Sequence, residues 1–157
     1  MNPPNILLFG PNGQVGWELR RSLAILGPVV ALDRNSADGA GDLRSPDQVG
    51  DAILRYRPQI VVNAAAYTAV DKAESEPEIA RTVNSDAPGA MATACARIGA
   101  LLVHYSTDYV FDGSGDTPWR ESDPTGPLNA YGATKLAGEE AIRDSGARHL
   151  ILRTSWV

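Results

Sequence analysis

The stretch Asn5-Ile-Leu-Leu-Phe-Gly-Pro-Asn-Gly-Gln-Val-Gly16 joins a short apolar run to three glycines spaced three residues apart. An apolar run that ends at a glycine is typical of a buried strand. In residues 14–26 the apolar side chains recur at nearly helical spacing, and Gly27-Pro28 ends the pattern. The stretch therefore predicts a strand, a tight turn and a helix, which together open a βαβ unit.

The same alternation continues along the chain. We expect further strands at 29–32, 60–62, 101–103 and 150–152, and helices at 46–57, 77–98 and 129–145. Ser45 is the expected N-cap of the helix that Pro46 begins, and Pro88 is expected to bend the long helix. Apolar strands separated by helices predict a doubly wound, Rossmann-like α/β fold with a parallel sheet. Residues 111–128, rich in Gly, Pro and Asp, are expected to form a long loop.

The composition indicates one domain, over residues 1–157. A chain of 157 residues with 43% hydrophobic content can bury one sizeable core. The net charge of −5 argues against a nucleic-acid partner, and the single cysteine, Cys95, excludes an internal disulfide. No apolar run approaches the ~20 residues of a membrane span, and the first residues do not resemble a signal peptide. We therefore expect a cytoplasmic protein without a membrane partner.

The glycine turn is a candidate phosphate site. Gly10, Gly13 and Gly16 would let the backbone approach a pyrophosphate, which would bind the amides of Gln14 and Val15 at the start of the helix. The spacing differs from the usual Gly-x-Gly-x-x-Gly, and a tight turn without a ligand is the alternative. Its position between a strand and a helix, at the start of a βαβ unit, favours a dinucleotide.

The charged residues after the second strand concern the choice of cofactor. Asp33 follows Gly13 by twenty residues, at the place where a carboxylate holds the 2′-hydroxyl of an adenosine ribose. Arg34 would instead attract a 2′-phosphate. Both could also be solvated loop charges. NADH and NADPH therefore both remain candidates.

Tyr131 and Lys135 lie four residues apart, which places both on one face of the expected helix. A nearby ammonium would lower the pKa of the phenol and make it useful for proton transfer to a carbonyl oxygen. An ordinary amphipathic helix is the alternative. Only two of the 14 basic residues are lysines, however, which hints that a compact ammonium is needed at Lys135.

Two other strand ends should face the same crevice. The small residues Asn63-Ala64-Ala65-Ala66 would leave room for a flat ligand, although tight packing explains them as well. Ser106-Thr107-Asp108 places hydroxyls at the carboxyl edge where open α/β sheets bind ligands, although a turn role competes. Thr107, Tyr131 and Lys135 together form a hydroxyl, phenol and ammonium set beside the expected dinucleotide.

These motifs resemble the extended short-chain dehydrogenase/reductases. More narrowly, residues 104–113, 127–139 and 152–156 resemble the dTDP-4-dehydrorhamnose reductase family. The resemblance implies reduction by NADPH or NADH of the 4-keto group of a dTDP-linked 6-deoxy sugar. The product would be dTDP-L-rhamnose, for polysaccharide synthesis.

The resemblance also implies roles for particular residues. Tyr131 would protonate the developing alkoxide, Thr107 would hydrogen-bond the carbonyl, and Lys135 would lower the pKa of the phenol and hold the nicotinamide ribose. Further cofactor contacts are expected from Asp42, Leu43, Ala64, Ala65, Ala66, Tyr67, Thr68 and Tyr105, and substrate contacts from Thr107, Asp108 and Trp156. Asn84 either supports the site or packs its helix.

Members of the resembled family continue into a smaller substrate domain, which we expect to be absent from this chain. The contacts of a homodimer, and any metal site, would lie in that part, so no metal ligands are predicted here. Two other functions stay open. One is a non-catalytic NAD(P)-binding regulatory subunit, and the other is a sugar-nucleotide epimerase or dehydratase of the same superfamily.

Overall fold

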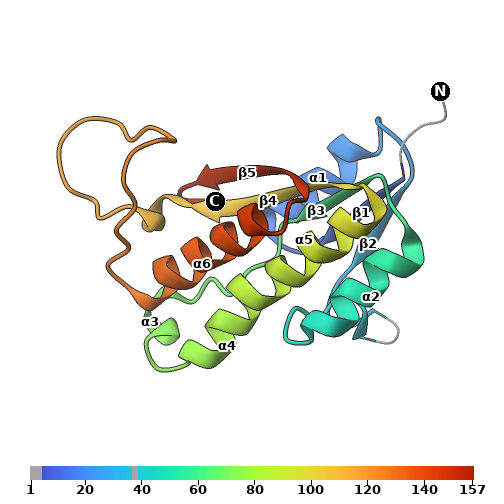
Figure 1. Ribbon diagram of the computed structural model, residues 1–157, viewed down its shortest axis with the longest axis horizontal. Helices are drawn as coiled ribbons and strands as arrows, with labels where there is room; N and C mark the ends of the chain where they lie inside the picture. The colour runs from blue at the N-terminus through green and yellow to red at the C-terminus, as the bar shows by residue number, and fades with distance from the viewer. Residues whose placement is uncertain (1–4, 37–38) are drawn as a thin grey trace.

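Five parallel strands form one sheet in the order β2-β1-β3-β4-β5 in the computed structural model of the chain (Figure 1). The structure describes residues 5–36 and 39–157. The strands are β1 (Ile6–Phe9), β2 (Val29–Leu32), β3 (Ile60–Asn63), β4 (Leu101–Thr107) and β5 (Arg148–Thr154). The strand order and the helical connections confirm the predicted doubly wound α/β fold. β4 and β5 extend further than predicted because their polar ends pair with each other through Thr107 and Thr154.

Helices connect the strands and cover the sheet (Figure 1). They are α1 (Gln14–Leu23), α2 (Pro46–Tyr56), α3 (Val70–Ala73), α4 (Pro77–Arg81), α5 (Ala87–Ile98) and α6 (Ala130–Asp144), with a π-helical turn η2 (Thr82–Asp86) and a 3₁₀ turn η3 (Asp108–Val110). The sequence did not predict α3 or η3, which are too short to show a helical period. None of the described helices is long and apolar enough to span a membrane.

The long helix predicted over 77–98 is interrupted just before Pro88 rather than bent at it. The turn η2 widens the helix between α4 and α5. Pro88 has no N–H to offer the carbonyl of Asn84, and its ring would crowd that carbonyl in a regular α-helix. A π-helical turn relieves the conflict. The Asn84 carbonyl then lies against α6 at Gly138, where an added Cβ would come within 2.1 Å of it.

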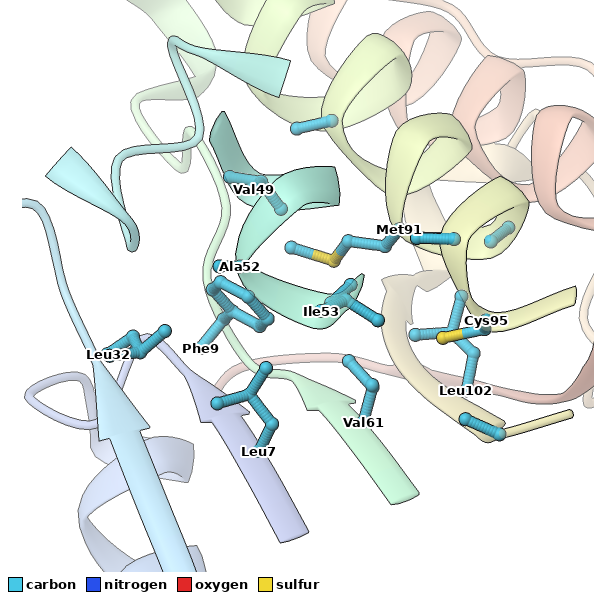
Figure 2. Packing of buried hydrophobic residues seen from close by; sticks show 14 of the residues in the cluster. Leu7, Phe9, Leu32, Val49, Ala52, Ile53, Val61, Met91, Cys95 and Leu102 are labelled. Carbon is cyan, nitrogen blue, oxygen red and sulfur yellow. The ribbon is translucent and has the colours of Figure 1, made fainter. Parts of the chain in front are cut away.

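Apolar layers hold helices on both faces of the sheet. On one face, side chains from the strands pack beneath α2 and α5 (Figure 2); the labelled residues are Leu7, Phe9, Leu32, Val61 and Leu102 from the strands and Val49, Ala52, Ile53, Met91 and Cys95 from the helices. On the other face, Ile6, Leu8 and Val62 pack with Leu19 and Leu23 of α1. Successive strand residues point to opposite faces, so a sheet covered on both faces requires strands that are apolar throughout.

Two capping details bear on how the site is placed. Ser45 occupies the N-cap position of α2, as predicted, but its side chain makes no capping hydrogen bond. Asn129 is the N-cap of α6, and its side chain does cap the helix: Oδ1 accepts from the backbone N–H of Gly132 at 2.7 Å. Residues 111–128 contain no helix or strand and extend away from the sheet before α6 begins (Figure 1), as the sequence predicted.

The sheet order places a crevice beside β1. β1 pairs with β2 on one side and with β3 on the other. The connection from β1 to β2 therefore runs toward one edge of the sheet, and the connection from β2 to β3 runs back toward the other edge. Ligands of open α/β sheets bind at such a switch point, outside the carboxyl ends of the strands. The glycine turn follows β1 at this point, and Ala64 follows β3.

Candidate active site

The glycine turn packs tightly against itself and against the end of β3. Gly10 has a φ of 78°, in the left-handed region, and a Cβ there would lie 2.7 Å from the backbone nitrogen of Ala65. A Cβ on Gly16 would lie 1.9 Å from the carbonyl oxygen of Gly10. Folding alone therefore requires glycine at both positions.

Gly13 lies between these two but has no such constraint. Its φ is −78°, and the nearest atom to an added Cβ is the Gly10 carbonyl oxygen, 3.9 Å away. Gly13 lines the crevice at the N-cap of α1, where backbone amides without helical partners bind phosphate. The absence of a side chain here, where packing would allow one, favours the pyrophosphate site over a tight turn without a ligand.

Two adjoining hollows run along the carboxyl edge of the sheet. The larger, of about 620 Å³, lies between the glycine turn, β4 and α6, and the smaller, of about 460 Å³, lies beyond β2. Both are lined by Gly10, Gly13, Ala65 and Ala66. The larger also takes the predicted residues Gln14, Val15, Ala64, Thr68, Tyr105, Thr107, Asp108, Tyr131, Lys135 and Trp156, and the smaller takes Asp33, Arg34, Asp42, Leu43 and Tyr67. Gly16 alone of the predicted set lies beneath the turn, where it is buried.

In the smaller hollow, Asp33 is held in place by its neighbours. Its Oδ2 accepts from Asn12 Nδ2 at 2.5 Å, and its Oδ1 accepts from the backbone N–H of Asn35 at 2.8 Å. A carboxylate with two fixed donors is not a freely solvated loop charge. This arrangement favours the predicted ligand-binding role for Asp33.

The same hollow contains a cation that the sequence analysis overlooked. Arg44 lines it together with Arg34, and the Arg44 guanidinium binds the Asp42 carboxylate, with Nη2 to Oδ2 at 2.6 Å. This hydrogen bond lowers the pKa of Asp42. Arg44 follows the predicted Asp42 by two residues, and this proximity could have indicated from the sequence that Arg44 belongs to the site. Two arginines and two carboxylates thus surround the smaller hollow.

In the larger hollow, Thr107 and Tyr131 approach from β4 and α6. The Thr107 hydroxyl is 5% exposed, donates to Asp108 Oδ1 at 3.2 Å and accepts from the backbone N–H of Tyr109 at 3.2 Å. The Tyr131 ring meets the Tyr109 ring edge-on, with centroids 5.6 Å apart. These contacts orient the hydroxyl and the phenol at the same part of the crevice.

The pKa of Tyr131 departs from the sequence expectation. Lys135 was expected to lower it, but burial raises it, and the opposing influence comes from a hydrogen bond with Thr107. Asp108 and Tyr109 raise the pKa further. The Lys135 Nζ instead donates to the backbone carbonyl oxygen of Tyr105. The phenol therefore stays protonated in the unliganded site, and the hydrogen bond with Thr107 favours its ionisation.

Lys135 is buried, with 1% exposure. Its Nζ donates to the carbonyl oxygen of Tyr105 at 2.6 Å and lies 3.4 Å from His104 Nε2. Burial lowers the pKa of Lys135 to about 8, and the charge of Glu139 acts in the opposite direction. The amine and ammonium forms are therefore close in free energy near neutral pH.

Glu139 continues the same helical face one turn beyond Lys135 and was not predicted. It is fully buried and binds two arginines: Arg153 Nε and Nη2 reach its carboxylate at 2.9 and 2.7 Å, and Arg143 Nη2 at 2.7 Å. Arg153 also lies over the ring of Phe111, 4.8 Å from its centroid. Tyr131, Lys135 and Glu139 are spaced four residues apart, and this spacing could have indicated from the sequence that all three share one face of the helix. Glu139 ties α6 to β5 beneath the site.

Asn84 acts as a structural tie between three segments. Its side chain accepts from the Tyr67 N–H at 2.9 Å and donates to the Tyr67 carbonyl at 3.1 Å and to Thr134 Oγ1 at 3.2 Å. It thereby holds the chain after β3 against α6. The sequence left two roles open for Asn84, support of the site and packing of its helix. The same hydrogen bonds can serve both roles.

The remaining predicted positions lie at the open side of the crevice. Trp156 lines the larger hollow but is 95% exposed, with a φ of 56°. Asp108 lines the same hollow beside Thr107. Within residues 5–36 and 39–157, no three His, Cys, Asp or Glu side chains gather closely enough to hold a metal ion.

Comparison with known proteins identifies relatives over almost the whole chain. Residues 4–157 match the family described as the RmlD substrate binding domain. A dTDP-4-dehydrorhamnose reductase of Shigella flexneri is 58% identical over 153 residues, which are 98% of this chain and 51% of the relative. The chain thus spans about half the length of the curated relatives it matches.

Solved structures agree with the sequence comparison. A dTDP-4-dehydrorhamnose reductase of Clostridium acetobutylicum has a TM-score of 0.90 at 37% identity, covering 97% of this chain and 53% of that one. The enzyme of the same name from Bacillus anthracis, solved in complex with NADP, has a TM-score of 0.91 at 34% identity and covers 99% of this chain and 54% of that one.

Proposed function

This chain belongs to the family of the RmlD substrate binding domain, and from that premise we propose that it is the cofactor-binding and catalytic part of a dTDP-4-dehydrorhamnose reductase. The reaction is the NADPH- or NADH-dependent reduction of the 4-keto group of a dTDP-linked 6-deoxy sugar to give dTDP-L-rhamnose. One observation carries the proposal. Thr107, Tyr131 and Lys135 line the same hollow as the glycine turn.

The residues present fit a dinucleotide. Gly13 and the first amides of α1 would hold the pyrophosphate, and Asp33 with Arg34 and Arg44 would surround the adenosine ribose. Ala64, Ala65 and Ala66 leave space between β3 and the crevice for a flat ring. When bound, the nicotinamide supplies a hydride to the ketone carbon.

The chain's own residues handle the oxygen of that ketone. On substrate binding the Thr107 hydroxyl would redirect its single proton from Asp108 Oδ1 to the carbonyl oxygen, and Tyr131 would give its phenolic proton to the same oxygen as negative charge develops there. The phenol is protonated near neutral pH, and the hydrogen bond with Thr107 opposes the rise of its pKa on burial, which favours this transfer. Lys135 holds the nicotinamide ribose and exchanges protons with the site.

The substrate and the partners follow from the relatives. The dTDP-sugar would enter from the open side of the crevice, where Asp108 and Trp156 lie. The homodimer and the cytoplasmic location expected from the sequence stay predictions.

The test is an assay of the protein that contains this chain. We expect it to oxidise NADPH when dTDP-4-dehydrorhamnose is added and to release the cofactor after each turnover. Cofactor that stays bound through purification, with no net oxidation, would indicate an epimerase or dehydratase instead. Cofactor binding without any reaction would indicate a regulatory subunit.

A further inference from the structure

A line of buried polar side chains runs behind Lys135, away from the crevice. Asn63 Oδ1 accepts from the backbone N–H of Ala65 at 3.1 Å, and Asn63 Nδ2 lies 3.1 Å from His104 Nδ1. His104 Nε2 lies 3.4 Å from Lys135 Nζ. Asn63 is fully buried, and His104 and Lys135 are each 1% exposed. The proposed reaction has so far given His104 and Asn63 no role.

The hydrogen-bonding capacity of each atom determines where the protons lie. The backbone N–H of Ala65 needs an acceptor, so the oxygen of the Asn63 amide faces Ala65 and its NH₂ faces His104. An amide NH₂ only donates. His104 Nδ1 must therefore accept, which leaves the ring proton on Nε2. Burial and the charge of Lys135 both lower the pKa of His104, so the ring stays neutral.

The Nε2–H of His104 consequently faces the nitrogen of Lys135. An ammonium group has only donors, so the protonated lysine and this N–H cannot bond to each other. The neutral amine has a lone pair and can accept the N–H. A separation of 3.4 Å is long for an established hydrogen bond but short enough for one to form. The contact therefore favours the amine over the ammonium.

We propose that His104 is a positioning residue for the catalytic lysine: held by Asn63, it presents Nε2–H to Lys135 Nζ and stabilises the neutral amine. Lys135 then exchanges its proton near neutral pH and is not a permanent charge. The catalytic meaning of this role rests on the proposed function, whereas the proton positions are a property of the chain itself.

The other charged groups around Lys135 do not supply this effect. Glu139 on α6 favours the ammonium, but Arg153 from β5 and Arg143 bind its carboxylate. Asp108 from η3 acts on Tyr131, and Glu74, which follows α3, binds the backbone N–H of Ala130 at the start of α6. Burial is the main cause of the lowered Lys135 pKa, and the carbonyl oxygen of Tyr105 favours the ammonium. The Nε2–H of His104 from β4 acts with burial, because its dipole opposes the charge at close range.

The composition makes a direct test possible. The chain has two histidines and two lysines, so histidine-¹⁵N and lysine-¹³C labels give few NMR signals to assign. Between roughly pH 6 and 10 we expect His104 to stay neutral with its proton on Nε2. Its Nε2 signal should shift with the same midpoint as the Lys135 Cε signal, while the exposed Lys72 serves as a reference. This measurement needs neither cofactor nor substrate.

A proton found on Nδ1, a His104 that titrates by itself, or an Nε2 signal indifferent to the Lys135 titration would each overturn the proposal. None of these outcomes depends on whether the protein is a reductase. A failed reductase assay, in turn, would leave the proton positions as measured.

A variant gives the direction of the effect. His104→Phe keeps a buried ring but removes the N–H, so the Lys135 midpoint should rise by roughly 0.5–1 pH unit. The exposed His149 provides the matched control, and His149→Phe should leave the midpoint unchanged. An unchanged or lower midpoint in a folded His104→Phe would contradict the proposal. If that variant does not fold, the measurement on the unaltered chain still decides.

Discussion

At the scale of single residues, the three glycines of the first turn have two different reasons to be there. Gly10 and Gly16 are required because any side chain would collide with the backbone of the turn or of β3. Gly13 has room for a side chain and an ordinary φ. Packing would allow a Cβ at Gly13, so we expect Gly13 to be the position of the turn whose substitution reports on ligand binding.

Gly13→Ala should therefore leave folding nearly intact while it weakens cofactor binding, because the added methyl group occupies the space of the pyrophosphate. Thermal unfolding and a titration of NADPH fluorescence measure the two effects. Gly10→Ala is the contrasting variant, and we expect it to unfold at a clearly lower temperature. An alanine at position 13 that binds NADPH normally would place the phosphates elsewhere.

Tyr131→Phe should lower turnover by about 10²–10⁴-fold, the usual span for an acid–base group, with cofactor affinity almost unchanged. The assay is NADPH oxidation with the 4-keto sugar nucleotide, in the protein that contains this chain. Tyr56 lies on α2, away from the crevice, and Tyr56→Phe serves as the control. Near-normal turnover in the first variant would exclude Tyr131 as the proton donor.

The choice of cofactor should depend on Asp33. Its carboxylate repels a 2′-phosphate, whereas Arg34 and Arg44 attract one, so Asp33→Ala should shift the preference toward NADPH. The ratio of the two dissociation constants, measured for both proteins, decides. A ratio that does not change would mean that Asp33 does not face the adenosine ribose.

At the scale of elements, α6 and β5 are joined beneath the site by Glu139 with Arg153 and Arg143. Burial alone would raise the pKa of Glu139, but hydrogen bonds from Arg153 and Arg143 lower it on balance. A carboxylate whose pKa is lower in the folded state stabilises the fold above its unfolded pKa. That stabilisation is lost as the pH falls through the folded pKa.

Glu139→Gln should cost about 3 kcal/mol of unfolding free energy at pH 7, because two arginines lose their buried partner. Urea unfolding of both proteins over a series of pH values measures this. The difference should shrink as the pH falls through the lowered pKa of the folded carboxylate, where the wild-type group becomes protonated as well. Glu140→Gln, at the exposed neighbouring position, should have little effect, and an equal loss there would remove the special role of Glu139.

At the scale of the whole molecule, the sheet leaves apolar side chains exposed at its β5 edge. Leu150 and Leu152 on the edge strand β5 are 49% and 36% exposed, and Trp156 is 95% exposed at the open side of the crevice. The core between α2, α5 and the strands is nevertheless complete. We expect folding and cofactor binding to need only residues of this chain, and the position of the sugar nucleotide to depend on further residues.

We therefore expect the 157-residue chain to fold as one domain, to bind NADPH and to catalyse little or no reduction. Poor orientation of two reactants can forfeit much of the ~7–11 kcal/mol that full orientation supplies. The exposed apolar side chains of β5 should also favour self-association. Fluorescence titration, the reductase assay and sedimentation test these points in turn. Full turnover by this chain alone would show that the site is complete within it.

Local sequence patterns were sufficient to predict the fold and to predict which residues lie at the ends of the strands. Apolar runs set the strands, and the carboxyl ends of parallel strands meet at one edge, so Thr107, Asp33 and the glycine turn had to lie near one another. Tyr131 joined them because α6 is the helix that connects β4 to β5, after η3 and the loop of residues 111–128.

Only the tertiary structure decided the charges inside the site and the partners of its buried groups. His104 and Glu139 look like ordinary polar residues in the sequence, because their roles depend on Asn63, Lys135 and Arg153, which are far from them along the chain. The pKa of Tyr131 rises, against the sequence expectation, because desolvation outweighs the hydrogen bond with Thr107. How deeply a side chain is buried and which groups it faces depend on packing in three dimensions, so the spacing of residues along the sequence does not predict them.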